Sequence, residues 1–192
     1  MDTYHVVLYV HLLALFVGIG AGSVLLACLF QLRAAQTVEQ AAPWGMLAGK
    51  VEKAFPIAVV GLFATGAYMT SHLWTWGTGW IDVSIAGLAV LALQGPLVGG
   101  RSGHKLKEAL MANGPGALGE EARRRARHIG LWGTEFANLG LVFGIVWNMT
   151  QKPSTAMSIV ACVVGYVVGV ALAYAFSQGG APATAPAAEP AA

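Results

Sequence analysis

The stretch VVLYVHLLALFVGIGAGSVLLACLF, residues 6–30, decides the fold class of this chain. It contains no Asp, Glu, Lys or Arg, and it is longer than the roughly 20 residues that an α-helix needs to cross a bilayer. It does not alternate between polar and apolar residues, as a strand of a membrane barrel does. It is too long for a secretory signal peptide, and no basic residue precedes it. The stretch therefore predicts a transmembrane helix.

Four further apolar stretches have the length of a membrane span, and they cover residues 55–74, 81–100, 129–150 and 156–177. Of the 192 residues, 56% are hydrophobic and only 10% are charged, against about 25% charged residues in a typical soluble domain. This composition excludes a typical soluble enzyme, and a net charge of +2 does not indicate nucleic-acid binding. We expect residues 1–178 to form an all-α membrane protein with five transmembrane helices. The Ala/Pro-rich tail, residues 179–192, is predicted to be disordered.

Lys and Arg residues fall almost entirely in two of the loops between the predicted spans. The loop after the first span holds Arg33, Lys50 and Lys53. The loop after the third span holds Arg101, Lys105, Lys107, Arg123, Arg124, Arg125 and Arg127, and the opposite side holds only Lys152. Because loops rich in Lys and Arg stay in the cytoplasm, we expect a multi-pass protein of the inner (plasma) membrane. Its N-terminus is predicted to lie outside and its C-terminus in the cytoplasm.

The second basic loop, residues 101–128, is predicted to have a structure of its own. Its two halves suit helices, and Asn113-Gly114-Pro115-Gly116 between them is typical of a turn. The sequence therefore predicts a basic helical hairpin at the cytoplasmic membrane surface. We interpret its arginines as contacts either for anionic lipid headgroups or for a membrane-protein partner. These arginines are Arg123, Arg124, Arg125 and Arg127.

Glycine pairs at four-residue spacing occur in four of the five predicted spans. The pairs are Gly18 and Gly22, Gly95 and Gly99, Gly140 and Gly144, and Gly165 and Gly169. Such pairs let two helix backbones approach closely. They predict either a compact bundle or a homodimer interface.

Ionisable and metal-ligating side chains near the outer ends of the first two spans form one candidate site. They are His5, His11, Met69 and His72. Imidazole and thioether groups together suit copper, and two imidazoles suit haem iron, so His11 and His72 are the candidate cofactor ligands. We place His72 within about one helical turn of the depth of His11. The alternative is structural, with His72 in an interfacial aromatic belt, His11 hydrogen-bonded to a neighbouring helix and Met69 in packing.

Three polar side chains closer to the cytoplasm form a second candidate site. Glu135 lies about 9 Å inside the fourth span, and Gln94 lies at a similar depth. Asn138 shares a helix face with Glu135. Burial favours the neutral form of the acid, so this group predicts a proton or cation station. The alternatives are a polar clamp between helices and pairing of the carboxylate with an arginine at the interface.

Several short motifs carry a family resemblance. They are His11-Leu-Leu-Ala-Leu-Phe-Val-Gly18-Ile-Gly20, Thr65-Gly66 followed by Tyr68, a Trp/Gly-rich turn over residues 74–80, and Asn148-Met149-Thr150-Gln151-Lys152-Pro153. Residues 5–155 thereby resemble the bacterial integral-membrane family DUF2269 and, more distantly, the CopD-like copper-resistance membrane proteins. The resemblance implies a four-helix core, to which the fifth span adds a C-terminal helix. It also implies copper passage at outer His and Met residues, and the matching positions here are His11, Met69 and His72.

Three functions are consistent with these observations. The first is binding of haem b or copper by the outer His and Met residues, with no cofactor at all as the alternative. The second is a non-catalytic membrane subunit or assembly factor that docks through the basic hairpin. The third is a proton-coupled transporter that uses Glu135. The sequence contains no Walker loop, Gly-x-Ser-x-Gly or His-Glu-x-x-His motif, and it assigns no enzyme activity.

Overall fold

The computed structural model of the chain describes residues 3–178, and every regular element in this range is a helix. The helices are α1 (Thr3–Ala34), α2 (Val38–Val51), α3 (Ala54–Leu73), α4 (Gly79–Gln94), η1 (Gly95–Gly100), α5 (Arg101–Asn113), α6 (Glu120–Ala126), α7 (Ile129–Gln151) and α8 (Thr155–Gln178). Five helical stretches are long and apolar enough to cross a membrane. The prediction of an all-α, multi-pass membrane protein is confirmed. The predicted disordered tail lies outside the described residues.

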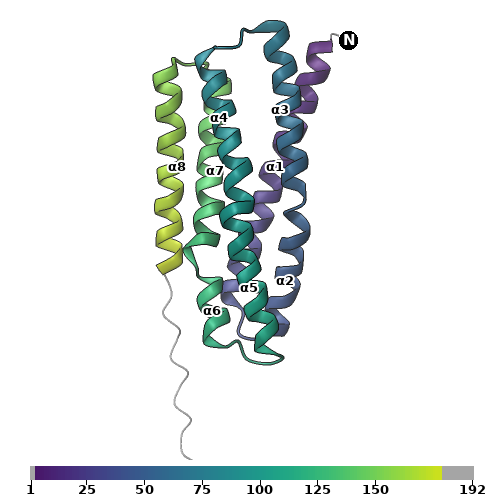
Figure 1. Cartoon of the computed structure of the whole chain (residues 1–192), viewed down its shortest axis with the longest axis vertical. Coiled ribbons are helices and arrows are strands. Elements are labelled where there is room, and N and C mark those ends of the chain that lie inside the picture. Colours follow the sequence, from purple (N-terminus) through teal and green to yellow (C-terminus); the bar gives the residue numbers. More distant parts are fainter. Residues whose placement is uncertain (1–2, 179–192) are drawn as a thin grey trace, which may run out of the picture.

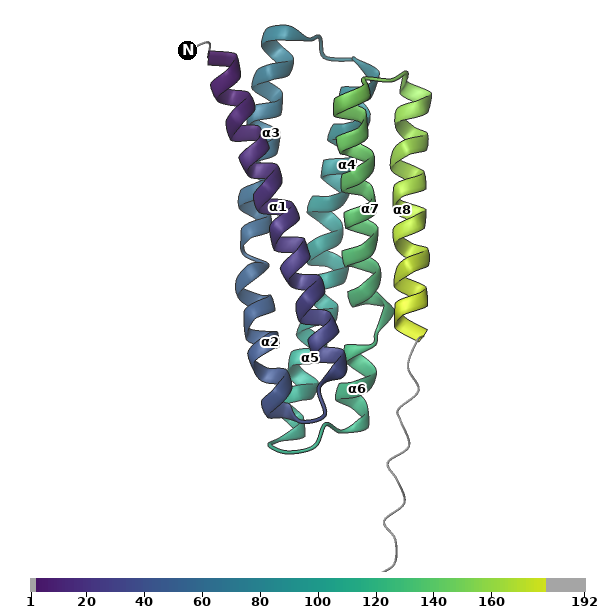
Figure 2. The ribbon, with the colours of Figure 1, turned by 180° about the vertical axis from the view of Figure 1, so that it is seen from behind.

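The long helices form two groups that stand side by side (Figure 1). Helices α1 and α3 pack together on one side, and α4, α7 and α8 pack together on the other. The view from behind shows α1 crossing the bundle diagonally, so that its C-terminal half comes close to α6 and α7 (Figure 2). Helices α2, α5 and α6 extend the bundle at one end, which we call the basic end because it carries most of the Lys and Arg residues.

All five helical stretches that could cross a membrane are longer than its hydrocarbon core is thick, so their ends extend beyond it. Residues Val38–Leu73 form 36 residues of nearly continuous helix, interrupted only around Glu52 and Lys53. At 1.5 Å per residue this is about 54 Å, against about 30 Å of hydrocarbon. The region between the first two spans, which we expected to be a loop, is therefore mostly the helix α2. Helix α4 likewise continues into α5 through the π-helical turn η1, where Pro96 lacks the N–H that an α-helical bond requires.

The residues of the predicted basic hairpin form α5 and α6, which a turn joins. The turn uses Gly114 at φ 69° and Gly116 at φ 101°, a backbone region that favours glycine. It docks on the start of α2, because the Val38 N–H donates to Gly116 O (2.9 Å) and the Leu118 N–H donates to Gln36 O (2.8 Å). The hairpin is thus part of the bundle and forms one wall of the basic end.

Glycines set the closest helix contact in the molecule, which is between α7 and α8. A Cβ atom at Gly140 would collide with the backbone carbonyl of Gly165, and one at Gly169 would collide with that of Phe136. A Cβ atom at Gly144 would lie 2.7 Å from the Cα of Cys162. Two of the four predicted glycine pairs are therefore covered within the chain, as a compact bundle requires.

An aromatic cluster fixes α8 to α1 and α7 near the basic end. The Trp132 side chain is fully buried, and its indole N–H donates to Ala126 O at 3.0 Å. Its ring contacts Phe30 edge-on and lies parallel to Phe176. The Arg33 guanidinium lies 5.6 Å from the centre of the Trp132 ring and also donates to the Phe176 carbonyl. These contacts join the two helix groups at the end where they meet.

Candidate functional site

The outer histidine His11 is held by the partner helix α3. Its Nδ1 lies 2.8 Å from the hydroxyl oxygen of Thr65, which itself donates to Gly61 O at 2.5 Å. Because the Thr65 proton is used in this way, the network assigns the His11 proton to Nδ1. The ring packs beside Gly66, where a Cβ atom would lie at an ordinary contact distance of 3.6 Å from the imidazole Cε1. This is the hydrogen-bonded arrangement that the sequence offered as the structural alternative.

Along the helix axis, His72 lies farther from the depth of His11 than the sequence predicts. It is seven residues beyond Thr65 on α3, which is about 10 Å along the helix, or two turns instead of one. The exposed imidazole of His72 stacks on the Tyr68 ring, with 4.0 Å between ring centres, and its Nδ1 lies 2.8 Å from the Tyr68 carbonyl. Both contacts are made within α3, and they orient the ring toward its own helix.

The outer His and Met residues make separate contacts. Between Thr3 and Gln178 no group of three or more His, Cys, Asp or Glu side chains could hold a metal ion. His5 makes an edge contact with the Tyr4 ring, at 5.6 Å between centres, and Met69 lies one turn before His72 on α3. Both hydrogen bonds use Nδ1, and they set His11 against Thr65 and His72 against its own helix. Binding of copper or haem at these residues stays a prediction from the sequence.

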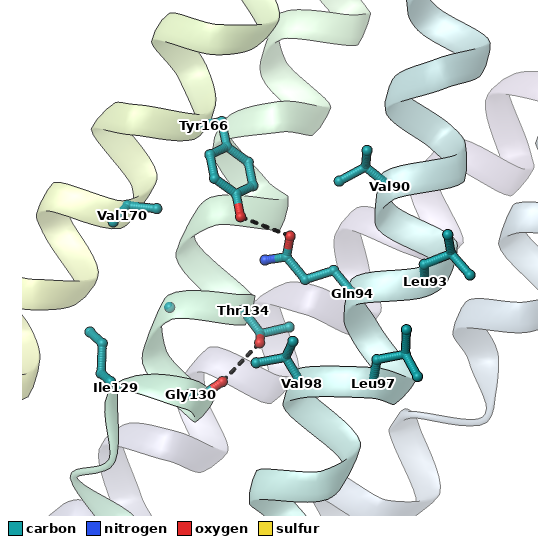
Figure 3. Close-up of a pocket in the computed structure, with 11 residues that line it drawn as sticks. Val90, Leu93, Gln94, Leu97, Val98, Ile129, Gly130, Thr134, Tyr166 and Val170 are labelled. Carbon is teal, nitrogen blue, oxygen red and sulfur yellow. Dashed lines mark hydrogen bonds between the residues drawn. The ribbon is translucent and has the colours of Figure 1, made fainter.

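The inner candidates are divided between two cavities, on different sides of α7. Gln94 lies in a cavity of about 530 Å³ between α4, η1, α7 and α8. Figure 3 shows the Tyr166 hydroxyl of α8 pointing at Gln94, to whose Oε1 it donates at 2.9 Å. The other side chains drawn there are mostly apolar, and Thr134 donates to its own helix at Gly130 O (2.8 Å). The amide of Gln94 therefore joins α4 to α8 and is not a partner of Glu135.

Glu135 lies in a separate cavity of about 710 Å³, which we call the glutamate cleft. Helices α1, α2, α5 and α7 and the turn η1 form its walls. Its apolar lining includes Leu25, Leu29, Met46, Leu110, Met111 and Leu131. Its charged lining consists of Lys50, Glu52, His104, Lys107 and Glu135. Among these five, Glu135 alone is half-buried, and the other four are exposed.

No cation neutralises Glu135 in the part of the chain that the structure describes. Its carboxylate forms neither an ion pair nor a side-chain hydrogen bond there, and the same is true of Glu52. No hydrogen bond joins Glu135 to Asn138 within the described residues, and the buried Oδ1 of Asn138 has no hydrogen-bond partner there either. Glu52 is the residue that sequence reasoning missed. Its only signal was a carboxylate three residues before an apolar span, and its position beside the cleft depends on how α2 packs.

The arginines of α6 are only partly available to a lipid or a partner. Glu121 pairs with Arg124 and accepts a hydrogen bond from Arg125 Nε at 2.7 Å. The hydrogen bond from Arg125 is the main cause of a lowered pKa of the Glu121 carboxyl. Arg124 is exposed, whereas Arg123, Arg125 and Arg127 are half-buried. The hairpin surface therefore has less free positive charge than its sequence indicates.

No family model, curated protein or solved structure matches the chain. The resemblance to DUF2269 and to CopD-like proteins thus stays a prediction from the motifs.

Proposed function

We propose that this membrane protein is a proton-coupled carrier that takes up and releases a proton at Glu135. The observation that carries the proposal is the position of Glu135, half-buried and without an ion pair in a cleft of about 710 Å³. An ionisable residue inside a membrane bundle is costly, so such residues mark proton and ion pathways. Glu52 and the exposed Lys50, Lys107 and His104 line the same cleft and supply a polar route to the basic end.

A hydrophobic carbodiimide tests the proton site directly, because it modifies protonated carboxyl groups in apolar surroundings. Dicyclohexylcarbodiimide should label Glu135 in the full-length protein, and labelling should decrease as the pH is raised. Mass spectrometry of the peptides locates the adduct. Glu120→Gln is the matched control, because Glu120 is an exposed carboxylate of α6 outside the cleft. An unlabelled Glu135 at every pH would contradict the proposal.

Proton movement is the second measurement. Proteoliposomes that contain a pH-sensitive dye, with the membrane potential clamped, should dissipate an imposed pH gradient faster than empty liposomes. Glu135→Gln should return the rate to that of empty liposomes, while Glu120→Gln should leave it unchanged. The thermal unfolding of both variants shows whether they are folded. Unchanged flux in a folded Glu135→Gln protein would remove Glu135 from the mechanism.

We further propose the orientation that the charges predict, with the basic end in the cytoplasm of a bacterial cell and the N-terminus outside its inner membrane. In this orientation the glutamate cleft opens toward the cytoplasm, and Arg124 lies near anionic lipid headgroups. Single cysteines at exposed positions of the two ends, in a background without Cys28 and Cys162, test the orientation with a membrane-impermeant thiol reagent. In intact cells a cysteine in the α3–α4 loop should react faster than one in α6. Faster labelling of α6 would show the opposite orientation.

A further inference from the structure

The glutamate cleft has the size of a small-molecule site. Its volume of about 710 Å³ lies within the range of about 300–1,000 Å³ that is typical of ligand pockets. The α2 wall is smooth because it contains Gly45 and Gly49, and a Cβ atom at either position would meet nothing within 4 Å. The space beside these glycines is therefore open and is not filled by neighbouring side chains.

The charges of the cleft favour a positively charged occupant. The carboxylates of Glu52 and Glu135 have no ion-pair partner in residues 3–178. His104 is already paired with Glu108 at 3.2 Å, on the exposed face of α5. The remaining charged groups that face the cleft are the exposed Lys50 of α2 and Lys107 of α5, and the lining from α1 and η1 is apolar or glycine. The positive groups thus lie in water, and the withdrawn group, Glu135, is negative.

An unsatisfied acceptor lies on the same helix face as Glu135. The Oδ1 of Asn138, one turn further along α7, is buried and has no hydrogen-bond partner. A buried acceptor without a donor costs about 1–3 kcal/mol. Asn138 is not part of the cleft lining, so Glu135 alone supplies the withdrawn negative group that an occupant of the cleft would meet.

The lining indicates an organic cation and not a metal ion. Calcium takes about 6–8 oxygen ligands and magnesium about six, and this cleft offers two carboxylates. Leucines dominate the rest of the lining, together with Met46 and Met111, whose flexible thioether side chains adapt to varied apolar shapes.

We propose that the glutamate cleft binds a hydrophobic organic monocation, which replaces the proton beside Glu135. This inference rests on the proposed function and names the substrate class of the same site. Binding of the cation releases a proton from Glu135 to the solvent, and binding of a proton releases the cation, so the two compete for Glu135. Charge balance requires no other reactant.

Tetraphenylphosphonium is the probe, used with the intact protein in nanodiscs. Its affinity, measured by equilibrium dialysis, should rise with pH by up to about tenfold per unit while it competes with one proton. It should also protect Glu135 from the carbodiimide. Neutral tetraphenylmethane should give no protection, and dodecanoate, an anion with an apolar chain, should give none either.

Two variants separate binding from folding. Glu135→Gln should weaken tetraphenylphosphonium binding at least about tenfold and remove its pH dependence. Gly45→Leu should fill the cleft and block binding while Glu135 stays present, because its Cβ has open space. Gly20→Leu is the control, since Gly20 also has open space but lies outside the cleft. Lys107→Gln should not weaken binding, because Lys107 repels a cation.

The outcomes separate this inference from the proposed function. Carbodiimide labelling of Glu135 without any binding of tetraphenylphosphonium would overturn the cation proposal and leave the proton carrier standing. Tight binding of dodecanoate that depends on Lys107 would overturn it in favour of an anionic amphiphile. Binding that survives Gly45→Leu in a folded protein would place the cation elsewhere and overturn the assignment to this cleft.

Discussion

The two sides of α7 differ more than any other two surfaces of the bundle. The side toward α8 carries Gly140 and Gly144, and it is so close to its partner that a Cβ atom would strike backbone. The side toward α1 and α2 carries Glu135 and borders a cleft of about 710 Å³. One side is thus built for contact and the other leaves room for a ligand. The comparison teaches that one helix can use one face for close packing and leave another face beside an open cleft.

The largest effect is expected from adding a side chain on the side of α7 that contacts α8. Gly140→Leu should destabilise the protein by at least about 3 kcal/mol, because the new side chain must push α8 away from α7. Denaturant unfolding in detergent measures this, together with the monodispersity of the purified protein. Gly22→Leu is the control, since a Cβ at Gly22 meets nothing within 4 Å. Equal stability of the two variants would show that the α7–α8 glycines are dispensable.

The two asparagines of α7 sharpen the comparison. Asn148 lies on the contact side, fully buried, with its Nδ2 donating to Ser158 O at 3.4 Å. Asn148→Ala should therefore cost about 1–2 kcal/mol of unfolding free energy. Asn138→Ala should cost clearly less, because removing a buried Oδ1 that has no hydrogen-bond partner among residues 3–178 relieves a desolvation cost, which offsets the lost packing. A larger cost at Asn138 would mean that its side of α7 is also a stabilising contact.

The smallest effect is expected at the start of α2, the helix that forms one wall of the glutamate cleft. The exposed carboxylate of Glu39 accepts from its own backbone N–H, from the Gly116 N–H at 2.9 Å and from the Thr37 hydroxyl. These bonds, in that order, lower the pKa of Glu39 below its usual value. Because the pKa is lower in the folded state, this contribution is present at neutral pH and is lost as the pH falls through the folded pKa.

Hydrogen exchange at Gly116 measures that loss. Its protection should decrease on acidification in the native protein, because protonated Glu39 is a weaker acceptor. Glu39→Gln should keep a moderate protection that does not depend on pH in this range. The same acid sensitivity in both proteins would show that Glu39 does not connect α2 to the hairpin turn.

Sequence reasoning found Glu135 because an ionisable residue inside an apolar run is visible without knowing its neighbours. It placed Gln94 beside Glu135 because their depths are similar, but depth is only a distance along a helix. The rotation of each helix about its axis decides which neighbour a side chain meets, and it directs Gln94 toward Tyr166. The same limit explains the outer histidines, since the register of α1 on α3 sets His11 against Thr65. Glu52 was missed because its position depends on the packing of α2.

The sequence by itself determined the five membrane-spanning helices and the hairpin with its basic charge. Hydropathy, turn residues and charge are properties of short segments, so they can be read before any contact is known. Only the tertiary structure decided that α7 meets α8 through glycines and that α1, α2, α5 and α7 enclose Glu135. Those features join residues far apart in the chain, and they depend on helix rotation and register, which a steric fit between whole surfaces selects.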